Sequence, residues 1–331
     1  MKFRLCAGLL AALLAINVQA EDLVGKIGLS LDGKHPQGMG LQKFADLAKQ
    51  KTNGRVSFRL FPNASLGNDI QMTTALQAGT LEVTLPASST VANLVKEIGL
   101  FDLPFLFNSP QEADAVLDGP IGQGILAKLP EKGLIGLAWM ENGYFTTTNS
   151  KHPITKLEDF QGLKLRAIQN PIYVDTTNAL GAIATPLPVT EVYTALETKA
   201  IDGQQTPTLA ALGFKFFDVQ KYLSLTNHTY NPFILIMSKK FWDKLSPADQ
   251  KAVQAAANEA RDYERTQSRA LNQGVLADVK AKGIVVNEIA PAEAARMRER
   301  VKPVVEKHVK LIGEPLYKEM MAQLAKMRGG K

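Results

Sequence analysis

Cysteine is nearly absent from this chain of 331 residues. Cys6 is the only one, and it lies in an N-terminal stretch that we expect to be removed. A mature chain without cysteine has no disulfide and no thiolate metal ligand, so its stability must come from buried apolar side chains. No later segment approaches the ~18 unbroken apolar residues of a membrane-spanning helix. We therefore expect a soluble mature chain that is long enough for two lobes rather than one.

The N-terminal stretch has the three parts of a secretory signal peptide. Lys2 and Arg4 form a cationic head, an apolar run covers residues 5–16, and Val18-Gln19-Ala20 places small residues where a signal peptidase cuts. The apolar run is too short to span a bilayer. We predict that residues 1–20 are a signal peptide, that it is cleaved after Ala20, and that the mature protein lies in the periplasm.

Signatures of catalysis and of metal binding are also missing. The sequence contains no G-x-S-x-G, no H-E-x-x-H, no C-x-x-C, and no G-x-G-x-x-G after a predicted strand. No histidine has a second metal ligand at helical spacing. We therefore predict no catalytic residue, no metal and no cofactor, and an enzyme on a similar scaffold is the least favoured alternative. The histidines are His35, His152, His228 and His308.

Positive charge is modest and thinly spread. The formal net charge is +6, and Lys2 and Arg4 of the predicted signal peptide supply two of these charges. The chain has no arginine-rich run and no alternation of basic with aromatic residues. This pattern favours a solvated surface with a weak attraction for anions, and it argues against nucleic acid as a partner.

Short apolar runs alternate with helical patterns along the chain, which predicts an α/β protein with largely parallel sheets. Val56, Phe58 and Leu60 alternate with polar residues up to Pro62, as in a half-buried strand. A helix is expected after Pro36, and Thr155 with Glu158 predicts a capping box before a short helix. The other predicted strands are 81–85, 134–139, 163–168, 233–237 and 284–289.

A long helix is predicted near the C-terminal end. Ser246, Pro247 and Asp249 supply an N-cap, a proline in the first turn and an acid at the third helical position. The alanine-rich sequence that follows has no proline before about Lys280. A helix of that length is expected to bridge two lobes, and the chain is expected to cross between the lobes more than once.

Six sequence blocks, in this order and at this spacing, resemble the periplasmic solute receptors of tripartite ATP-independent periplasmic (TRAP) transporters, the DctP family. The resemblance extends from about residue 25 to residue 260. The blocks are Phe101-Asp102-Leu103-Pro104-Phe105-Leu106-Phe107, Leu117-Asp118-Gly119-Pro120, Gly162-Leu163-Lys164-Leu165-Arg166, Thr190-Glu191-Val192-Tyr193-Thr194-Ala195-Leu196-Glu197, Ile201-Asp202-Gly203-Gln204, and Phe217-Asp218-Val219-Gln220-Lys221-Tyr222-Leu223-Ser224-Leu225-Thr226-Asn227-His228.

The resemblance implies a two-lobed periplasmic binding protein fold with a ligand cleft between the lobes and a long helix that bridges them. It implies a receptor, most often a monomer, that closes on a small organic acid and delivers it to integral-membrane permease subunits. Transferred to this sequence, lobe one covers residues 21–143 plus 232–271, and lobe two covers residues 144–231 plus 272–331. The alternative function on the same fold is a ligand receptor that reports to a sensor kinase or chemoreceptor rather than to a transporter.

Arg166 is the residue that the resemblance assigns to the ligand carboxylate. Leu163, Leu165 and Ala167 are expected to face the core, while Arg166 lies on the opposite face near the carboxyl end of a strand, where open α/β sheets bind ligands. A guanidinium contacts both oxygens of a carboxylate at once and so fixes its orientation. A surface salt bridge is the alternative role for this arginine.

Two positions depart from the pattern of many relatives that bind acidic sugars or dicarboxylates. Phe145, in Asn142-Gly143-Tyr144-Phe145-Thr146, stands where they carry a second arginine. Thr206, in Gln204-Gln205-Thr206-Pro207, stands where the family carries an asparagine before proline. A second carboxylate would then lack its cation, and burial of an unpaired charge is costly. We therefore expect a monocarboxylate, such as a keto, hydroxy, aromatic or sugar acid, with a dicarboxylate as the alternative.

The remaining candidates for the ligand site are predicted by position. Three aromatic residues are candidate walls, with ordinary core packing as the alternative role. Four polar residues are candidates for ligand hydroxyl, keto or amine groups, and four others are expected to face the cleft from the first lobe. The walls are Phe145, Tyr173 and Phe233; the polar residues are Glu141, Gln169, Asn170 and Gln205; the first-lobe residues are Ser30, Asp32, His35 and Ser88.

Overall fold

The computed structural model describes residues 22–329, so the predicted cleavage site after Ala20 lies outside the described residues. The strands form one mixed sheet in the order β2-β1-β3-β9-β4-β7-β5-β6, and β8 and β10 extend it from β4. The strands are β1 (Leu23–Gly28), β2 (Val56–Phe61), β3 (Val83–Thr84), β4 (Leu134–Asn149), β5 (Lys164–Ala167), β6 (Ile183–Pro186), β7 (Gly203–Pro207), β8 (Tyr222–Leu225), β9 (Tyr230–Ser238) and β10 (Val285–Glu288).

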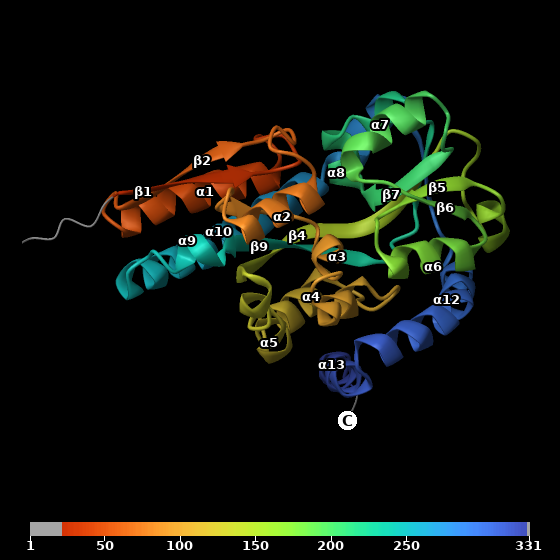
Figure 1. Ribbon diagram of the computed structural model, residues 1–331. Helices are drawn as coiled ribbons and strands as arrows, with labels where there is room; N and C mark the ends of the chain where they lie inside the picture. The colour runs from red at the N-terminus through yellow and green to blue at the C-terminus, as the bar shows by residue number, and fades with distance from the viewer. Residues whose placement is uncertain (1–21, 330–331) are drawn as a thin grey trace, which may run out of the picture.

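Two long strands join the two halves of this sheet. In the first half, β2, β1 and β3 are parallel, whereas β9 is antiparallel to both β3 and β4. In the second half, β7, β5 and β6 are parallel to one another, and β7 and β8 are antiparallel to β4. The sheet is therefore mixed where β4 and β9 cross from one half to the other (Figure 1). The prediction of largely parallel sheets holds within each half and fails at this junction.

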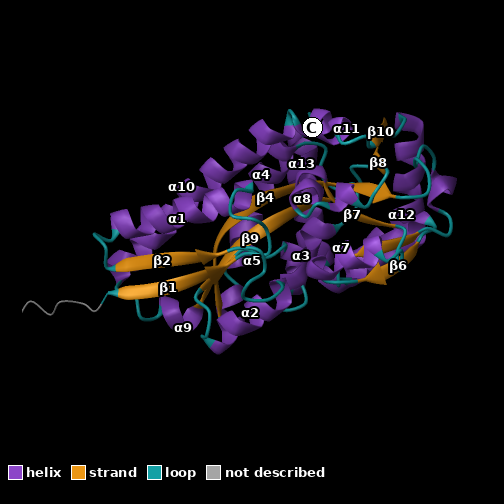
Figure 2. Cartoon of the chain, turned by 90° about the horizontal axis from the view of Figure 1, so that it is seen from above, coloured by secondary structure: helices purple, strands orange, loops and turns teal. Residues whose placement is uncertain are grey.

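Helices cover both faces of the strands (Figure 2). Four short 3-10 helices lie between them, η1 (Lys96–Asp102), η2 (Leu129–Lys132), η3 (Leu157–Phe160) and η4 (Phe216–Asp218). None of the helices between residues 22 and 329 has the length and apolar character needed to cross a bilayer. The α-helices are α1 (Pro36–Lys51), α2 (Asp69–Ala78), α3 (Ser88–Val91), α4 (Pro110–Leu117), α5 (Pro120–Leu126), α6 (Pro171–Leu180), α7 (Val189–Glu197), α8 (Thr208–Gly213), α9 (Lys239–Trp242), α10 (Pro247–Asn272), α11 (Val275–Ala281), α12 (Pro291–Ile312) and α13 (Glu314–Met327).

The long helix α10 contacts both halves but ends earlier than predicted. It packs along α1 and β4 of the first half and also contacts α8 of the second. It stops at Asn272 rather than near Lys280, and Gly274, a poor helix former, stands between it and α11. Beyond the break, Val275 and Val279 of α11 pack into the core of the second half.

The C-terminal helices also connect the halves. Helix α12 contacts α6 of the second half and η1 of the first. Helix α13, which the predicted division assigns to lobe two with the rest of residues 272–331, packs against α4 through the buried Met320 and Leu324. The division of the chain into lobes stays a prediction.

The capping box predicted at Thr155 and Glu158 is displaced by one residue. Asp159, not Glu158, accepts hydrogen bonds from the backbone N–H groups of Thr155 and Lys156 and from the Thr155 hydroxyl. Glu158 instead forms an ion pair with Arg296 of α12. The helix that follows is the 3-10 helix η3.

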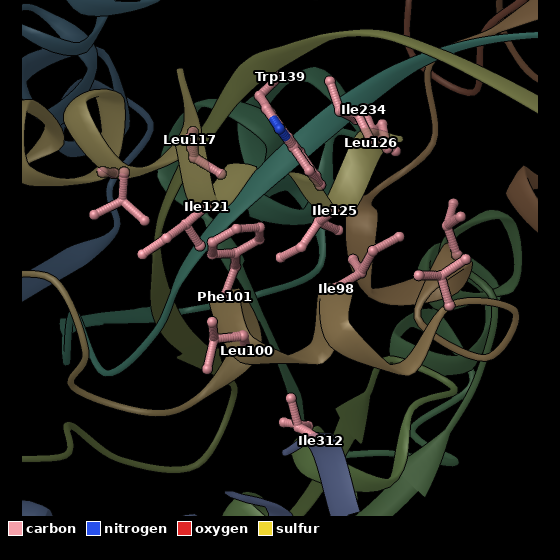
Figure 3. Packing of buried hydrophobic residues seen from close by; sticks show 14 of the residues in the cluster. Ile98, Leu100, Phe101, Leu117, Ile121, Ile125, Leu126, Trp139, Ile234 and Ile312 are labelled. Atoms are coloured by element: carbon pink, nitrogen blue, oxygen red, sulfur yellow. The ribbon is translucent and has the colours of Figure 1, made fainter. Parts of the chain in front are cut away.

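The largest buried cluster fills the first half and is drawn in part in Figure 3. Phe101 and Trp139 meet edge to face at its centre, with ring centroids 5.1 Å apart. Ile312 of α12 and Ile172 of α6 belong to the same cluster. Apolar packing therefore continues from the first half into elements of the second.

Loss of the N-cap of α10 is expected to destabilise the protein. The Ser246 hydroxyl oxygen accepts from the Asp249 N–H at 3.1 Å and donates to the Asp249 carboxylate at 2.7 Å. Ser246→Ala should lower the free energy of unfolding by about 1 kcal/mol, measured by urea denaturation, because a helical N–H loses its acceptor. Ser246→Thr keeps a hydroxyl and is the control. Equal stability of the alanine variant and the wild type would contradict this role.

Candidate functional site

A cavity between the two halves of the sheet is lined by residues from both of them. The first half contributes the loop after β1, the start of α2, the segment from β3 to α3, and β9. The second half contributes the end of β5, the loop from β6 to α7, and residues near β7 and α8. Six predicted site residues lie in this lining: Ser30, Phe145, Arg166, Gln169, Thr206 and Phe233.

Arg166 is buried in the cavity wall without a carboxylate in contact. It lies in β5, paired with Thr185 of β6 and Gln204 of β7, and its side chain is held by a 2.9 Å hydrogen bond from Nε to the Leu187 carbonyl oxygen. Only 4% of the residue is exposed, and none of the ion pairs among residues 22–329 includes it. Burial lowers the pKa of Arg166 to about 10, although the nearby Asp69 charge opposes that change. A buried cation of this kind calls for an anionic partner.

Asp69, which the sequence analysis did not single out, stands in the same cavity. It is the first residue of α2, after the N-cap Asn68. The Ser30 hydroxyl donates to its Oδ1, and the Ala87 N–H donates to its Oδ2 at 3.2 Å. Burial raises the pKa of the Asp69 carboxyl group, while these hydrogen bonds and Arg166 oppose the rise. The capping pattern of Asn68 with Gln71 is the sequence signal that would have marked this helix start.

Apolar and aromatic side chains form most of the remaining wall. Phe145 on β4 is 1% exposed, and Phe233 on β9 is also buried. Tyr173 lies behind Phe145, with ring centroids 5.3 Å apart, and does not itself line the cavity. Phe214, which was not predicted, completes the aromatic lining. The cavity thus combines one buried cation with a few polar groups and a large apolar surface, as is typical of small-molecule sites.

Four other predicted residues lie outside the cavity lining and have partners elsewhere. The Glu141 carboxylate pairs with Arg269 of α10 at 2.7 Å, and Gln205 Oε1 accepts from the Thr177 hydroxyl at 3.0 Å. Asp32 is exposed in the loop after β1, where its carboxylate accepts from the Lys34 N–H. His35 is buried at the start of α1 and packs against Gly213 of α8.

The last three predicted residues, Ser88, Asn170 and Tyr173, form a buried polar network behind the cavity wall. Its centre is Asp102, which accepts from the Tyr173 hydroxyl and from Asn231 Nδ2, each at 3.1 Å. Asn231 Nδ2 also lies 3.3 Å from the Ser88 hydroxyl, and Asn170 Nδ2 donates to the Ser89 carbonyl oxygen. Burial raises the pKa of Asp102 to about 8, although its hydrogen bonds oppose the rise. The network joins α3 and η1 of the first half to α6 of the second.

Asn142 connects this network to the cavity. It lines the cavity, and its Nδ2 donates to Asn231 Oδ1 at 3.0 Å. Asn142 stands in the quoted block with Phe145, so its position was visible in the sequence, but nothing in the sequence marks its role. Among the described residues, no three or more His, Cys, Asp and Glu side chains are grouped as a metal ion requires.

His35 is expected to make stability depend on pH. The residue is buried, and burial lowers the pKa of His35 to about 4, although contacts with Gln37 and the Leu209 backbone and the nearby Asp32 oppose that change. In the unfolded chain the imidazole takes up a proton near pH 6.5. Between these values the unfolded state binds more protons, so the contribution of His35 to stability is full above pH 6.5 and is lost as the pH falls toward 4.

Urea denaturation of the wild type and His35→Gln at several pH values across this window tests that expectation. The free energy of unfolding should fall less steeply on acidification in the variant, and some slope should remain because burial also lowers the pKa of His228 to about 4. The exposed His152 offers the matched control, His152→Gln, which should follow the wild type. Parallel curves for the wild type and His35→Gln would contradict the assignment.

Comparison with known proteins places the chain in a family. The family model described as bacterial extracellular solute-binding protein, family 7 (DctP), matches residues 27–311. Among curated relatives, the 2,3-diketo-L-gulonate-binding periplasmic protein YiaO of Escherichia coli is 36% identical over 277 residues, 84% of each chain. The C4-dicarboxylate-binding periplasmic protein DctP of Rhodobacter capsulatus is 33% identical over 307 residues, 92% of each chain.

Solved structures agree with this match. A TRAP periplasmic solute-binding protein from Ochrobactrum anthropi, with a C-terminus bound in its ligand-binding pocket, is 45% identical, with a TM-score of 0.84 over 94% of this chain and 97% of that one. The sugar acid binding protein DctPAm from Advenella mimigardefordensis, in complex with galactonate, is 39% identical. Its TM-score is 0.90 over 92% of this chain and 99% of that one. The mixed α/β architecture is thus that of two-lobed TRAP receptors, and the chain belongs to the DctP family of bacterial extracellular solute-binding proteins, receptors that bind small acids for transport.

Proposed function

We propose that this protein captures a small monocarboxylic acid in the cavity between its halves and delivers it to the membrane permease subunits of a TRAP transporter. The observation that carries the proposal is the buried guanidinium of Arg166, which has no carboxylate in contact and is fixed by the Leu187 carbonyl. A ligand carboxylate would supply the missing negative charge and accept from the N–H groups of the guanidinium that Leu187 does not use.

The charges of the lining favour one carboxylate rather than two. Within residues 22–329, Arg166 is the only lysine or arginine that lines the cavity, and Asp69 adds a carboxyl group to it. Phe145 and the apolar side chains around it offer no cation for a second carboxylate. A dicarboxylate would therefore bury one charge without a partner. The C4-dicarboxylate-binding relative keeps the dicarboxylate as the alternative ligand, whereas the galactonate-bound relative binds an acid with one carboxylate.

Lobe closure would follow from contacts that the ligand makes with both halves. Arg166 belongs to β5 in the second half, whereas Ser30 and Asp69 belong to the first. A ligand held between them gains more contacts in the closed form than in the open form, and it shifts the equilibrium by that difference in affinity. Arg166 supplies much of the difference, because its attraction for the carboxylate grows as closure excludes water.

Truncation of Arg166 should abolish high-affinity binding. Against the best ligand from a thermal-shift screen of monocarboxylic acids, Arg166→Ala should cost about 2–5 kcal/mol of binding free energy, measured by calorimetry. Arg166→Lys keeps the charge without the planar guanidinium, so its affinity should lie between the affinities of the wild type and Arg166→Ala. Arg59→Ala, an exposed arginine on β2, is the matched control. Unchanged affinity in Arg166→Ala would overturn the proposed function.

The number of carboxylates is tested with matched ligands. A monocarboxylate and the dicarboxylate of the same carbon skeleton should differ by about tenfold or more in affinity, in favour of the monocarboxylate, because the second charge would be buried unpaired. Phe145→Arg should reduce this preference if the variant folds, as checked by circular dichroism. Tighter binding of the dicarboxylate by the wild type would replace the proposed ligand class with its alternative.

A further inference from the structure

The direction of the hydrogen bonds behind the cavity determines which polar atom Asn142 presents. Asn231 Nδ2 faces three oxygen atoms, Asp102 Oδ1 at 3.1 Å, Tyr173 Oη at 3.0 Å and Ser88 Oγ at 3.3 Å. The Tyr173 hydroxyl gives its only hydrogen to Asp102 Oδ1, so Tyr173 Oη can only accept, and the atom of Asn231 that faces it must be a donor. The amide of Asn231 is thereby fixed with its nitrogen toward Asp102.

The carbonyl oxygen of the Asn231 side chain must then point the other way, toward Asn142. Asn142 Nδ2 donates to it at 3.0 Å. A reversed Asn142 would bring two amide oxygens together, which leaves both without a donor. The orientation of Asn142 is therefore set by Asp102, which does not line the cavity, through Asn231.

Asn142 Oδ1 is left without a hydrogen-bond partner in the described chain, although only 8% of the residue is exposed. Asn142 lines the cavity, and the pairing of β4 with β9 is irregular between Glu141 and Gly143, so Asn142 is the extra residue of a bulge. Bulges beside functional sites redirect side chains. A buried carbonyl oxygen without a donor is costly, and a ligand group is the partner that the cavity can supply.

We propose that Asn142 Oδ1 is a specificity-determining acceptor, which selects hydroxylated monocarboxylates over the corresponding keto and deoxy acids. This inference rests on the proposed function and narrows its ligand class. A hydroxyl group donates to Asn142 Oδ1, whereas a keto oxygen there would face another acceptor and a methylene group would leave it unpaired. The Asp69 carboxylate is a second acceptor in the same cavity. Arg166 supplies donors for the carboxylate, so the cavity is complementary to an anion that also carries hydrogen-bond donors.

Matched ligand triplets test the inference on the wild type alone. Each triplet consists of a hydroxy acid in both enantiomers, the keto acid and the deoxy acid of the same skeleton, and dissociation constants are measured by calorimetry. The better hydroxy enantiomer should bind about 10- to 100-fold more tightly than the keto acid in the triplets that fit the cavity, the range expected when a buried acceptor is left unpaired. Equal or tighter binding of the keto acids would overturn the inference while leaving the monocarboxylate proposal intact.

Variants then assign the preference to Asn142. Asn142→Leu should remove most of the preference for hydroxy acids while affinity for the deoxy acid is kept or improved, because the unpaired oxygen is gone. Asn231→Leu should weaken the preference although Asn231 does not line the cavity, because the amide of Asn142 is then free to rotate. The exposed Asn258 offers the matched control, Asn258→Leu.

The outcomes separate the two proposals. A preference that persists in Asn142→Leu would assign the selection to another residue and overturn the role of Asn142. If a variant does not fold, a crystal structure of the wild type with its best hydroxy acid decides: a ligand hydroxyl more than hydrogen-bonding distance from Asn142 Oδ1 would reject the inference. Loss of all acid binding in the wild type, or no effect of Arg166→Ala, would instead reject the proposed function.

Discussion

The organisation of the cavity depends on one buried guanidinium without an anion beside it. Arg166 is fixed by a backbone carbonyl from the β6–α7 loop and lies in the field of Asp69, but it contacts neither Asp69 nor any other carboxylate of the described chain. Removal of a charge from water without a partner costs several kcal/mol, so such an arrangement lowers stability unless something else supplies the charge. In a receptor this cost is repaid when an anionic ligand binds. If the ligand is an anion, as proposed, Arg166 is the residue that makes closure of the two halves depend on the ligand.

The two long strands β4 and β9 place the other parts of the site around this charge. Phe145 and Asn142 stand on β4, and Phe233 and Asn231 stand on β9, where these strands cross from one half of the sheet to the other. The proposed ligand contacts of Asn142, Phe145 and Phe233 thus lie at the junction itself. The buried network around Asp102 connects helices of both halves close to this junction.

Much of the fold could be predicted from the sequence because its signals are local. Pro62 ends β2, and Ser246 and Pro247 start α10, since each acts through its own backbone or the next turn. The predicted capping box and the predicted end of the long helix were wrong, and both places involve contacts with residues distant in the sequence. Thr155 donates a hydrogen bond to Asp159, whereas Glu158 forms an ion pair with Arg296, which is far away in the sequence. Likewise α10 ends at Asn272, and the apolar residues beyond Gly274 belong to α11, which packs into the second core.

The candidate site shows the same division. The strand pattern and the family resemblance were enough to bring Arg166, Phe145 and Thr206 to one cavity, because position on a strand fixes the face of a side chain. They could not separate residues that line the cavity from residues one layer behind it, and Ser88, Asn170 and Tyr173 fall in that second layer. The capping pattern of Asn68 and Gln71 marks the helix start at Asp69, but that α2 brings Asp69 to the cavity depends on how the helix packs.

An asparagine has both a donor and an acceptor on its side chain, so its presence in the lining does not determine whether Asn142 pairs with a donor or with an acceptor of the ligand. The atom that Asn142 presents depends on Asp102 of η1, an acceptor two hydrogen bonds away that is buried between α3 and α6. On this inference the polar layer outside the lining belongs to the recognition site, and substitutions there should alter which acids are chosen more than whether an acid is bound.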